Sequence, residues 1–469
     1  MVGFFAFFNL GKTTLYNWDE GIYANLTAEM GKIPSFSLSH GGEPWLQKPV
    51  FGIWLHSVGV DLFGLNNFGL RAMSAFSFVM SAFVLYLLLR KFYSNILAFI
   101  ITMSFGVCPL LFFPHIIRTA DLDTYFLFFS IASIYLYVLS WSRPRLFWLA
   151  GVFVGLAFMA RGYIAILIFF VIFFHWFWLK RQGKTQNLKL AYMAGAFLLI
   201  VLPWHIYSYL AHPLVFINSY IDYSFWQRLV TPLEGHAGGP WFYTDFALYE
   251  LSIFFLVFLA AIIYVPIEMA RSFKDEDCLW LLWFWIFFLT LQLMDTKIIW
   301  YLMGVAPALF CLVAAAFDHW LKNTSHKTVL IVSAAILGLA YFTCFFINAF
   351  YYVWRPVILP IDMLDNYLSE KSVKPDIIFV YSKLDELKGP AADFQWNKLH
   401  HDNVVWVDKI SDIQLGLSGQ KKCLIVTDNV SEPEISSYFV KRFTSAPVIL
   451  GFYQTAWGDF GNVIVLDQK

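Results

Sequence analysis

The stretch YIAILIFFVIFFHWFWL, residues Tyr163 to Leu179, contains no charged side chain. Such a run is typical of a membrane-spanning helix, because about 20 apolar residues of helix cross the hydrocarbon core. A second apolar run, residues 146–160, precedes it, and only Arg161 and Gly162 separate the two. One helix over both runs would be about 51 Å long, well beyond a bilayer, so the sequence favours two helices over one kinked helix.

Similar runs occur along most of the first 350 residues. The chain starts with a short apolar run, Met1–Leu10, that lacks a basic n-region and a cleavage site, so it predicts a first membrane segment and no cleavable signal peptide. We expect about eleven crossings in all. Besides those already named, they lie near residues 69–89, 95–114, 124–141, 189–210, 246–268, 279–294, 298–318 and 327–350.

The composition supports an integral membrane protein. Hydrophobic residues make up 59% of the 469 residues and charged residues 14%, and the mean hydropathy is +0.63. Soluble proteins carry about 25% charged residues, so a soluble enzyme and a disordered chain are both excluded. Lys plus Arg balances Asp plus Glu at 32 each, which gives no support for binding nucleic acid. The five cysteines are scattered and predict neither a disulfide framework nor a zinc motif.

Basic residues predict the orientation, because cytoplasmic loops are enriched in Lys and Arg. One set of loops holds Arg90-Lys91, Arg143 and Arg145, Lys180 to Lys189, Arg271-Lys274, and Lys322 to Lys327. The other set, expected to face the periplasm, includes the long segments 12–68 and 211–245 and the turns after Arg118 and at Asp295–Lys297.

The composition changes near residue 355, so we expect a membrane domain over 1–354 and a small soluble α/β domain over 355–469 on the periplasmic side. Charges become frequent there, and a helical pattern covers Ile435–Phe443. The β-like runs are Ile377–Tyr381, Val404–Val407, Leu424–Thr427, Val448–Phe452 and Val463–Leu466.

Ionisable residues beside apolar spans are the candidate site residues, because function or pairing must offset their desolvation. Asp19 and Glu20 follow the first span; solvated acids at an interface are the alternative interpretation. Two amphipathic runs in the same loop, Ala24–Met30 and Val50–Phe63, predict helices lying at headgroup depth.

Three further groups lie on the same face. Arg118, Asp121 and Asp123 open one span, where helix capping or pairing of Arg118 with an acid would also explain them. Lys297 and Tyr301 lie between two apolar spans, where the lysine either snorkels or meets a lipid phosphate. The loop 211–245 adds the last group: Arg228, Glu234 and His236.

Together these groups place carboxylates and cations at headgroup depth. Cations suit a lipid phosphate or pyrophosphate, and a carboxylate beside them suits a general base. The combination favours chemistry on a lipid-linked phosphate over ion conduction.

The order of motifs resembles the polytopic GT-C glycosyltransferases that use polyprenyl-phosphate sugars. It is most similar to the bacterial aminoarabinose lipid A transferases, relatives of the protein O-mannosyltransferases. The motifs are Asp19-Glu-Gly-Ile-Tyr-Ala24, Gln47-Lys-Pro49, Arg118 with Asp123, Arg161-Gly162, and Lys297 with Tyr301 and Pro307.

The resemblance implies a mainly α, multi-pass GT-C fold in a bacterial inner membrane and an inverting transfer on the periplasmic face. It implies Asp19 as catalytic base and Asp123 as a second catalytic acid. Glu20, Arg118, Asp121 and His236 would support the site. The residues expected to bind the donor phosphate are Lys48, Arg228, Lys297 and Tyr301.

The implied partners are a polyprenyl-phosphate sugar donor and an acceptor, with a lipid A-like glycolipid favoured over a glycan or protein, and we expect a monomer. Members commonly have Arg where this chain has Ile22 and Glu where it has Gln47. In aminoarabinose transferases that Glu is implicated, with the loop histidine, in a metal site. No cofactor is therefore assigned, and a divalent metal is left open.

Two alternatives belong to other classes. A lipid or sugar transporter or flippase would carry its charges near the bilayer midplane, whereas the charges here lie at the external edge. A non-catalytic scaffold would fit the departures at Ile22 and Gln47, but Asp19, Lys48, Asp123 and Lys297 are all retained.

Overall fold

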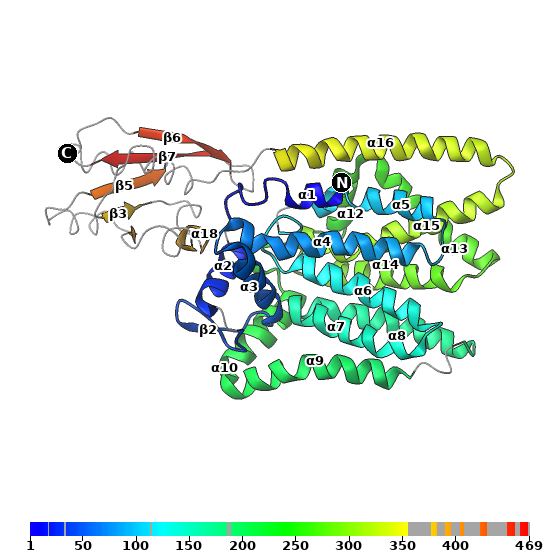
Figure 1. Ribbon diagram of the computed structural model, residues 1–469, viewed down its shortest axis with the longest axis horizontal. Coiled ribbons are helices and arrows are strands. Elements are labelled where there is room, and N and C mark those ends of the chain that lie inside the picture. Colours follow the sequence, from blue (N-terminus) through cyan, green and yellow to red (C-terminus); the bar gives the residue numbers. More distant parts are fainter. Residues whose placement is uncertain are drawn as a thin grey trace.

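The computed structural model shows a bundle of long, roughly parallel helices with shorter elements gathered at one end (Figure 1). We call this the site end. The residues that the structure describes are 1–16, 18–31, 34–112, 115–184, 189–354, 377–381, 390–394, 404–407, 423–428, 448–454 and 460–467.

Within these described residues, eight helical segments are long and apolar enough to span a membrane. Their length and composition make this a multi-pass membrane protein. They are α4 (Asn67–Leu89), α6 (Asp123–Ser140), Pro144–Arg161 with α7 (Phe147–Arg161), Tyr163–Arg181 with α8 (Ile166–Arg181), α9 (Leu190–Ala211), Phe242–Arg271 with α12 (Phe242–Leu251) and α13 (Phe255–Arg271), α14 (Asp275–Leu293) and α16 (Lys327–Trp354).

The other three expected crossings correspond to α1 (Val2–Phe7), α5 (Asn95–Phe105) and α15 (Ala306–Asn323). These helices are not among the eight, so their crossing of the bilayer stays a prediction. Short 3-10 turns complete several segments: η1 (Pro109–Leu111), η2 (Pro144–Leu146), η3 (Tyr163–Ala165), η5 (Leu233–Gly235), η6 (Ser252–Phe254) and η7 (Ile299–Gly304).

The prediction of two helices joined at Gly162 is confirmed. Helix α7 ends at Arg161, and Gly162 takes φ +90°, a conformation that L side chains rarely adopt. Glycine also sets the packing of α7 on α9, because Gly151 lies directly against the backbone of Met193 and Gly155 against Ile200. Small residues four apart let membrane helices approach closely.

The segment before α4 contains the two expected helices, α2 (Asp19–Met30) and α3 (Phe51–Phe63), and their place at headgroup depth stays a prediction. An antiparallel hairpin of β1 (Leu38–His40) and β2 (Glu43–Trp45) lies between them in the chain. All four elements lie at the site end of the bundle (Figure 1).

The loop after α9 is also helical at first, with α10 (Pro213–Val215), a π-helix (Phe216–Gln227) and α11 (Arg228–Val230). Its later part pairs with the turn before η7. Asp295 N donates to Leu229 O, and Lys297 N donates to His236 O at 2.9 Å. These hydrogen bonds bring two site-residue groups together that are far apart in sequence.

The C-terminal region contains a mixed five-stranded sheet of order β4-β3-β5-β7-β6, in which β4, β3 and β5 are parallel and β7 is antiparallel to both neighbours. All five β-like runs are strands; the helical pattern at Ile435–Phe443 lies outside the described residues. The described strands are β3 (Ile377–Val380), β4 (Val404–Trp406), β5 (Cys423–Asp428), β6 (Val448–Gln454) and β7 (Phe460–Asp467), and a described helix is α18 (Pro390–Asp393).

A short segment of this region, residues 390–394, packs on α2. Asn25 Nδ2 donates to Pro390 O at 2.9 Å, and Gly21 lies directly against the backbone of Pro390 and Ala391. Its apolar side chains join one buried cluster with the membrane domain, made of Leu15, Ala24, Leu70, Ala120, Ala391 and Phe394.

Candidate active site

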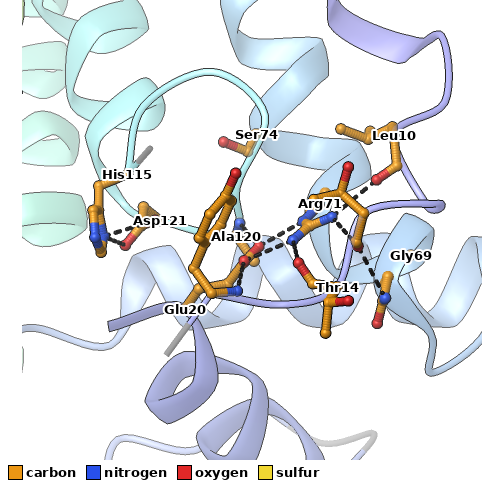
Figure 2. A network of polar contacts seen from close by, with 12 residues as sticks. Leu10, Thr14, Glu20, Gly69, Arg71, Ser74, His115, Ala120 and Asp121 are labelled. Carbon is orange, nitrogen blue, oxygen red and sulfur yellow. Dashed lines mark hydrogen bonds and ion pairs between the residues drawn. The ribbon is translucent and has the colours of Figure 1, made fainter. Parts of the chain in front are cut away.

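Glu20 and Arg71 form a wholly buried ion pair between α2 and α4 (Figure 2). The Glu20 carboxylate accepts from Arg71 Nε at 2.6 Å and Nη2 at 2.7 Å, and from the backbone N–H groups of Ala120 and Tyr16. The backbone oxygens that accept the remaining Arg71 hydrogen bonds belong to Leu10, Thr13 and Thr14.

This network is satisfied on both sides, so removing one partner would leave an uncompensated buried charge, at a cost of about 3–5 kcal/mol. It ties the start of α2, where Asp19 lies, to the segment that carries Asp121. Glu20 therefore has a positioning role, because its hydrogen bonds fix the backbone segments that carry Asp19 and Asp121.

Asp123, the first residue of α6, pairs with Arg161, the last residue of α7. Arg161 Nε lies 2.9 Å from Asp123 Oδ2, and both side chains are about 5% exposed or less. The Arg161 guanidinium also lies over the ring of Tyr301, 5.5 Å from its centre. Tyr301 is therefore connected to Asp123 through its contact with the Arg161 guanidinium.

Lys48, in the loop between β2 and α3, forms no hydrogen bond or ion pair within the part of the chain that the structure describes. Burial, with Arg161 and Arg228 beside it, lowers the pKa of its amine to about 7, while Asp19 and Asp123 oppose the shift. An anion bound beside this amine would stabilise its charged form, so the surroundings of Lys48 suit an anionic ligand.

Arg228 lies beside this group but is already paired, with Glu234 Oε1 at 3.0 Å. Burial lowers the pKa of Arg228, but the Tyr301 and Glu234 side chains raise it overall, and Arg228 in turn contributes to lowering the pKa of Glu234. The Arg228 Nε atom is buried and has no hydrogen-bond partner among the described residues. One donor therefore remains available to a ligand.

Two of the basic residues expected in the site hold helix ends instead. Arg118 donates to the carbonyl oxygens of Phe5 at 2.6 Å and Phe8 at 2.8 Å, at the end of α1, so the expected pairing with an acid is not formed in the described chain. Lys297 Nζ donates to Leu291 O at 3.0 Å and Gln292 O at 2.7 Å, at the end of α14. These two bonds use two of the three N–H donors of the ammonium group.

His115 and Asp121 lie side by side in the loop before α6 (Figure 2). His115 Nδ1 lies 3.4 Å from both carboxylate oxygens of Asp121. Burial alone would lower the pKa of His115, but Asp121, with Asp19 and Asp123, outweighs it and raises the pKa to about 9. The same pairing overcomes burial at Asp121 and lowers its pKa.

Trp300 links this pair to the loop after α9. The His115 ring stacks on Trp300 with ring centres 4.3 Å apart, and the His236 ring meets the same indole edge-on at 6.0 Å. Burial lowers the pKa of His236. The predicted groups at Asp19, Asp121, Asp123 and His236 therefore converge at one end of the bundle.

Sequence reasoning left three of these residues without a role: Arg71, His115 and Trp300. Arg71 carried a usable signal, because a charge inside an apolar span needs a partner. Arg161 was recognised only as part of a motif. His115 and Trp300 had no such signal, since a lone histidine and an aromatic residue at a span boundary are common.

Comparison with known proteins identifies the fold. Residues 47–207 match the family model described as dolichyl-phosphate-mannose-protein mannosyltransferase. The structure aligns with that of ArnT from Cupriavidus metallidurans bound to undecaprenyl phosphate, with TM-score 0.70 and 15% identity over 99% of this chain and 96% of that one. Archaeal oligosaccharyltransferase AglB from Archaeoglobus fulgidus aligns with TM-score 0.58 and 13% identity, over 98% of this chain and 72% of that one. The chain has the fold of the GT-C glycosyltransferases.

Within that class the chain resembles the aminoarabinose transferases and the O-mannosyltransferases. It is 25% identical over 384 residues to the undecaprenyl phosphate-alpha-4-amino-4-deoxy-L-arabinose arabinosyl transferase of Shewanella sediminis, covering 75% of this chain. The aligned region spans 66% of that relative's length.

Proposed function

We propose that the chain is a bacterial inner-membrane glycosyltransferase that moves a sugar from a polyprenyl-phosphate donor to an acceptor at the periplasmic face. The supporting observation is the Lys48 amine, which has no partner among the described residues and lies beside Arg161 and Arg228 and close to the carboxylates of Asp19 and Asp123. A phosphate is the anion that such a group of cations suits, and a carboxylate beside it can act as base.

In this mechanism Asp19 accepts the proton of an acceptor hydroxyl while that oxygen attacks the anomeric carbon of the sugar. The bond from this carbon to the donor phosphate oxygen breaks, and the electron pair leaves with the polyprenyl phosphate. Lys48 and Arg228 stabilise the charge that grows on the phosphate. A single displacement inverts the anomeric carbon.

Asp123 orients Arg161 and, through it, Tyr301. The name of the Shewanella sediminis relative supports an undecaprenyl phosphate-linked donor. A lipid A-like glycolipid is the favoured acceptor on the resemblance to the aminoarabinose lipid A transferases alone. A glycan or a protein acceptor would use the same proton transfer.

Transfer of label from a polyprenyl-phosphate sugar to an acceptor lipid tests the proposal, with the purified full chain in lipid nanodiscs. We expect Asp19→Asn to lose at least about a hundredfold in rate, since general bases contribute 10²–10⁴. The matched control is Asp61→Asn, an exposed aspartate of α3, which should keep the wild-type rate.

Wild-type turnover by Asp19→Asn would remove Asp19 as base. Movement of the labelled donor across vesicles without any label in the acceptor would overturn the transferase and favour the flippase alternative.

A further inference from the structure

A polar groove lies between the ends of α13 and α15, at the end of the bundle away from α2 and α3 (Figure 1). Its volume is about 550 Å³, within the range of small-ligand sites, about 300–1,000 Å³. The α13 residues are spaced i, i+4 and i+7 and therefore share one face of the helix. The lining includes Tyr264, Glu268 and Arg271 from α13 and Trp320, Asn323 and Thr324 from the end of α15.

Glu268 holds the Arg271 guanidinium at the mouth of this groove. The Glu268 side chain is 3% exposed, and its carboxylate accepts from Arg271 Nη1 and Asn323 Nδ2, each at 2.7 Å. A carboxylate in the last turn opposes the helix dipole, and these two hydrogen bonds offset that cost. The Arg271 side chain is 70% exposed, and a guanidinium has five N–H groups, so donors remain for a ligand.

The accessible charge of the groove is positive. Glu268 is the one acid among the lining residues, and it is buried, whereas Arg271 is exposed. The carboxylate of Asp318, also in α15, is shared by Lys274 Nζ at 3.0 Å and Lys322 Nζ at 2.7 Å, which leaves a further positive charge in excess. An ammonium group would meet no exposed carboxylate in the lining. This arrangement favours a ligand with net negative charge over a zwitterion.

The position of the groove along α13 suits the headgroup layer of a bilayer. Arg271 is the last residue of the candidate span Phe242–Arg271, and Tyr264 lies about 10 Å nearer the membrane centre. Tyr264 and the exposed indole of Trp320 are residues of the kind enriched at membrane interfaces. Ile267, exposed on the adjacent face of α13, offers apolar surface to an acyl chain. The groove therefore provides a basic group for a phosphate and an apolar surface for the chains attached to it.

We propose that this groove binds the headgroup of an anionic phospholipid, whose phosphate accepts hydrogen bonds from Arg271 and whose acyl chains lie along α13. With the orientation predicted above, the lipid belongs to the cytoplasmic leaflet, which attracts basic groups through its negative surface potential. The bound lipid joins the ends of α13 and α15 at the opposite end of the bundle from Asp19 and Lys48. The site is therefore independent of the proposed sugar transfer.

The test is the binding of fluorescent phosphatidylglycerol to the full-length chain, delipidated in a nonionic detergent. Phosphatidylcholine has the same phosphodiester but no net charge, and we expect it to bind at least about fivefold more weakly. Arg271→Gln should weaken binding of phosphatidylglycerol at least about tenfold, because it removes charge-assisted hydrogen bonds. The matched control is Arg90→Gln, an exposed arginine that donates to Asn95 Oδ1 at 2.9 Å, and it should bind like the wild type.

Glu268→Gln separates lipid binding from a purely structural contact between the helix ends. The amide oxygen still accepts from Arg271, and a negative charge is lost, so this variant should bind phosphatidylglycerol at least as tightly as the wild type.

Thermal unfolding without lipid shows which variants are folded. If Arg271→Gln does not fold, the comparison of the two lipids in the wild type and the Glu268→Gln result still decide the proposal. It is overturned by equal wild-type affinity for the two lipids, by lost binding in folded Glu268→Gln, or by an equal loss in Arg271→Gln and Arg90→Gln. Displacement of the lipid by an equal concentration of glycerol phosphate also overturns it, because the site would then bind a soluble phosphate.

Discussion

Lys48 is the residue whose protonation bears most directly on donor binding. Its pKa is about 7 in the free protein, chiefly because burial disfavours the charged form. An anionic donor favours the charged form, so binding above pH 7 must be accompanied by proton uptake. Affinity is then full below pH 7 and falls as the pH rises.

We therefore predict that the Kd for a polyprenyl-phosphate sugar rises about tenfold per pH unit above 7. The donor is a phosphodiester, so its own charge does not change in this range. Fluorescence quenching with a labelled donor between pH 6 and 9 would measure it. Lys48→Arg should give a flat profile because arginine stays charged, and Lys48→Ala should bind weakly throughout.

A wild-type Kd that stays constant from pH 6 to 9 would contradict this role and leave Lys48 as a structural lysine. Arg228 would then be the first candidate for the donor phosphate, because its Nε atom is the buried donor without a partner in the described chain.

At the scale of elements, the apolar runs predict most helices, because hydrocarbon burial dictates both their composition and their length. The boundaries are less predictable. Helix α5 ends at Phe105 and not near residue 114, since Gly106 and Pro109 interrupt it, and α15 begins at Ala306, after Gly304. Glycine and proline residues therefore determine where these helices begin and end more strongly than hydropathy does.

The sequence singled out the carboxylates of the candidate site and two of its cations, Lys48 and Arg228, but it did not separate these from Arg118 and Lys297. Asp19 and Asp123 lie where acids beside a span predict a site. Arg118 and Lys297 occupy equivalent sequence positions, yet they bind the carbonyl oxygens of α1 and α14. A cation beside a helix end has two possible anionic partners, a ligand or the helix carbonyls, and only the three-dimensional arrangement separates them.

Helix α2 also contacts the C-terminal region. Gly21 allows the backbone of residues 390–394 to approach this helix closely. A Cβ atom there would collide with the backbone of Pro390 and Ala391. In α2 itself alanine is the better helix former by about 1 kcal/mol, so the substitution strains only the contact with residues 390–394.

We predict that Gly21→Ala detaches this segment and raises the rate of limited proteolysis of the C-terminal region at least severalfold, as followed by gel electrophoresis. The matched control is Gly195→Ala in α9, where a Cβ meets nothing within 4 Å. Equal cleavage rates for Gly21→Ala and wild type would show that the contact contributes no stability.

For the whole molecule, the distribution of charge matters more than the net charge of zero. The basic loops, such as the one between α13 and α14, lie at the end of the bundle away from α2 and α3 (Figure 1). The site end instead combines Asp19, Glu20, Asp121 and Asp123 with basic side chains such as Arg71 and Arg161, which pair with two of them. Because Lys and Arg are retained in the cytoplasm, the site end should face the periplasm.

Cysteine labelling in intact cells tests this orientation, in a chain whose five native cysteines are replaced by alanine. We predict that a membrane-impermeant maleimide labels Glu43→Cys, in β2 at the site end, without lysis. Ser272→Cys, exposed between α13 and α14, should react only after lysis, and it serves as the matched position at the opposite end. The reverse pattern would place Asp19 and Lys48 in the cytoplasm, and a periplasmic glycolipid could then no longer be the acceptor.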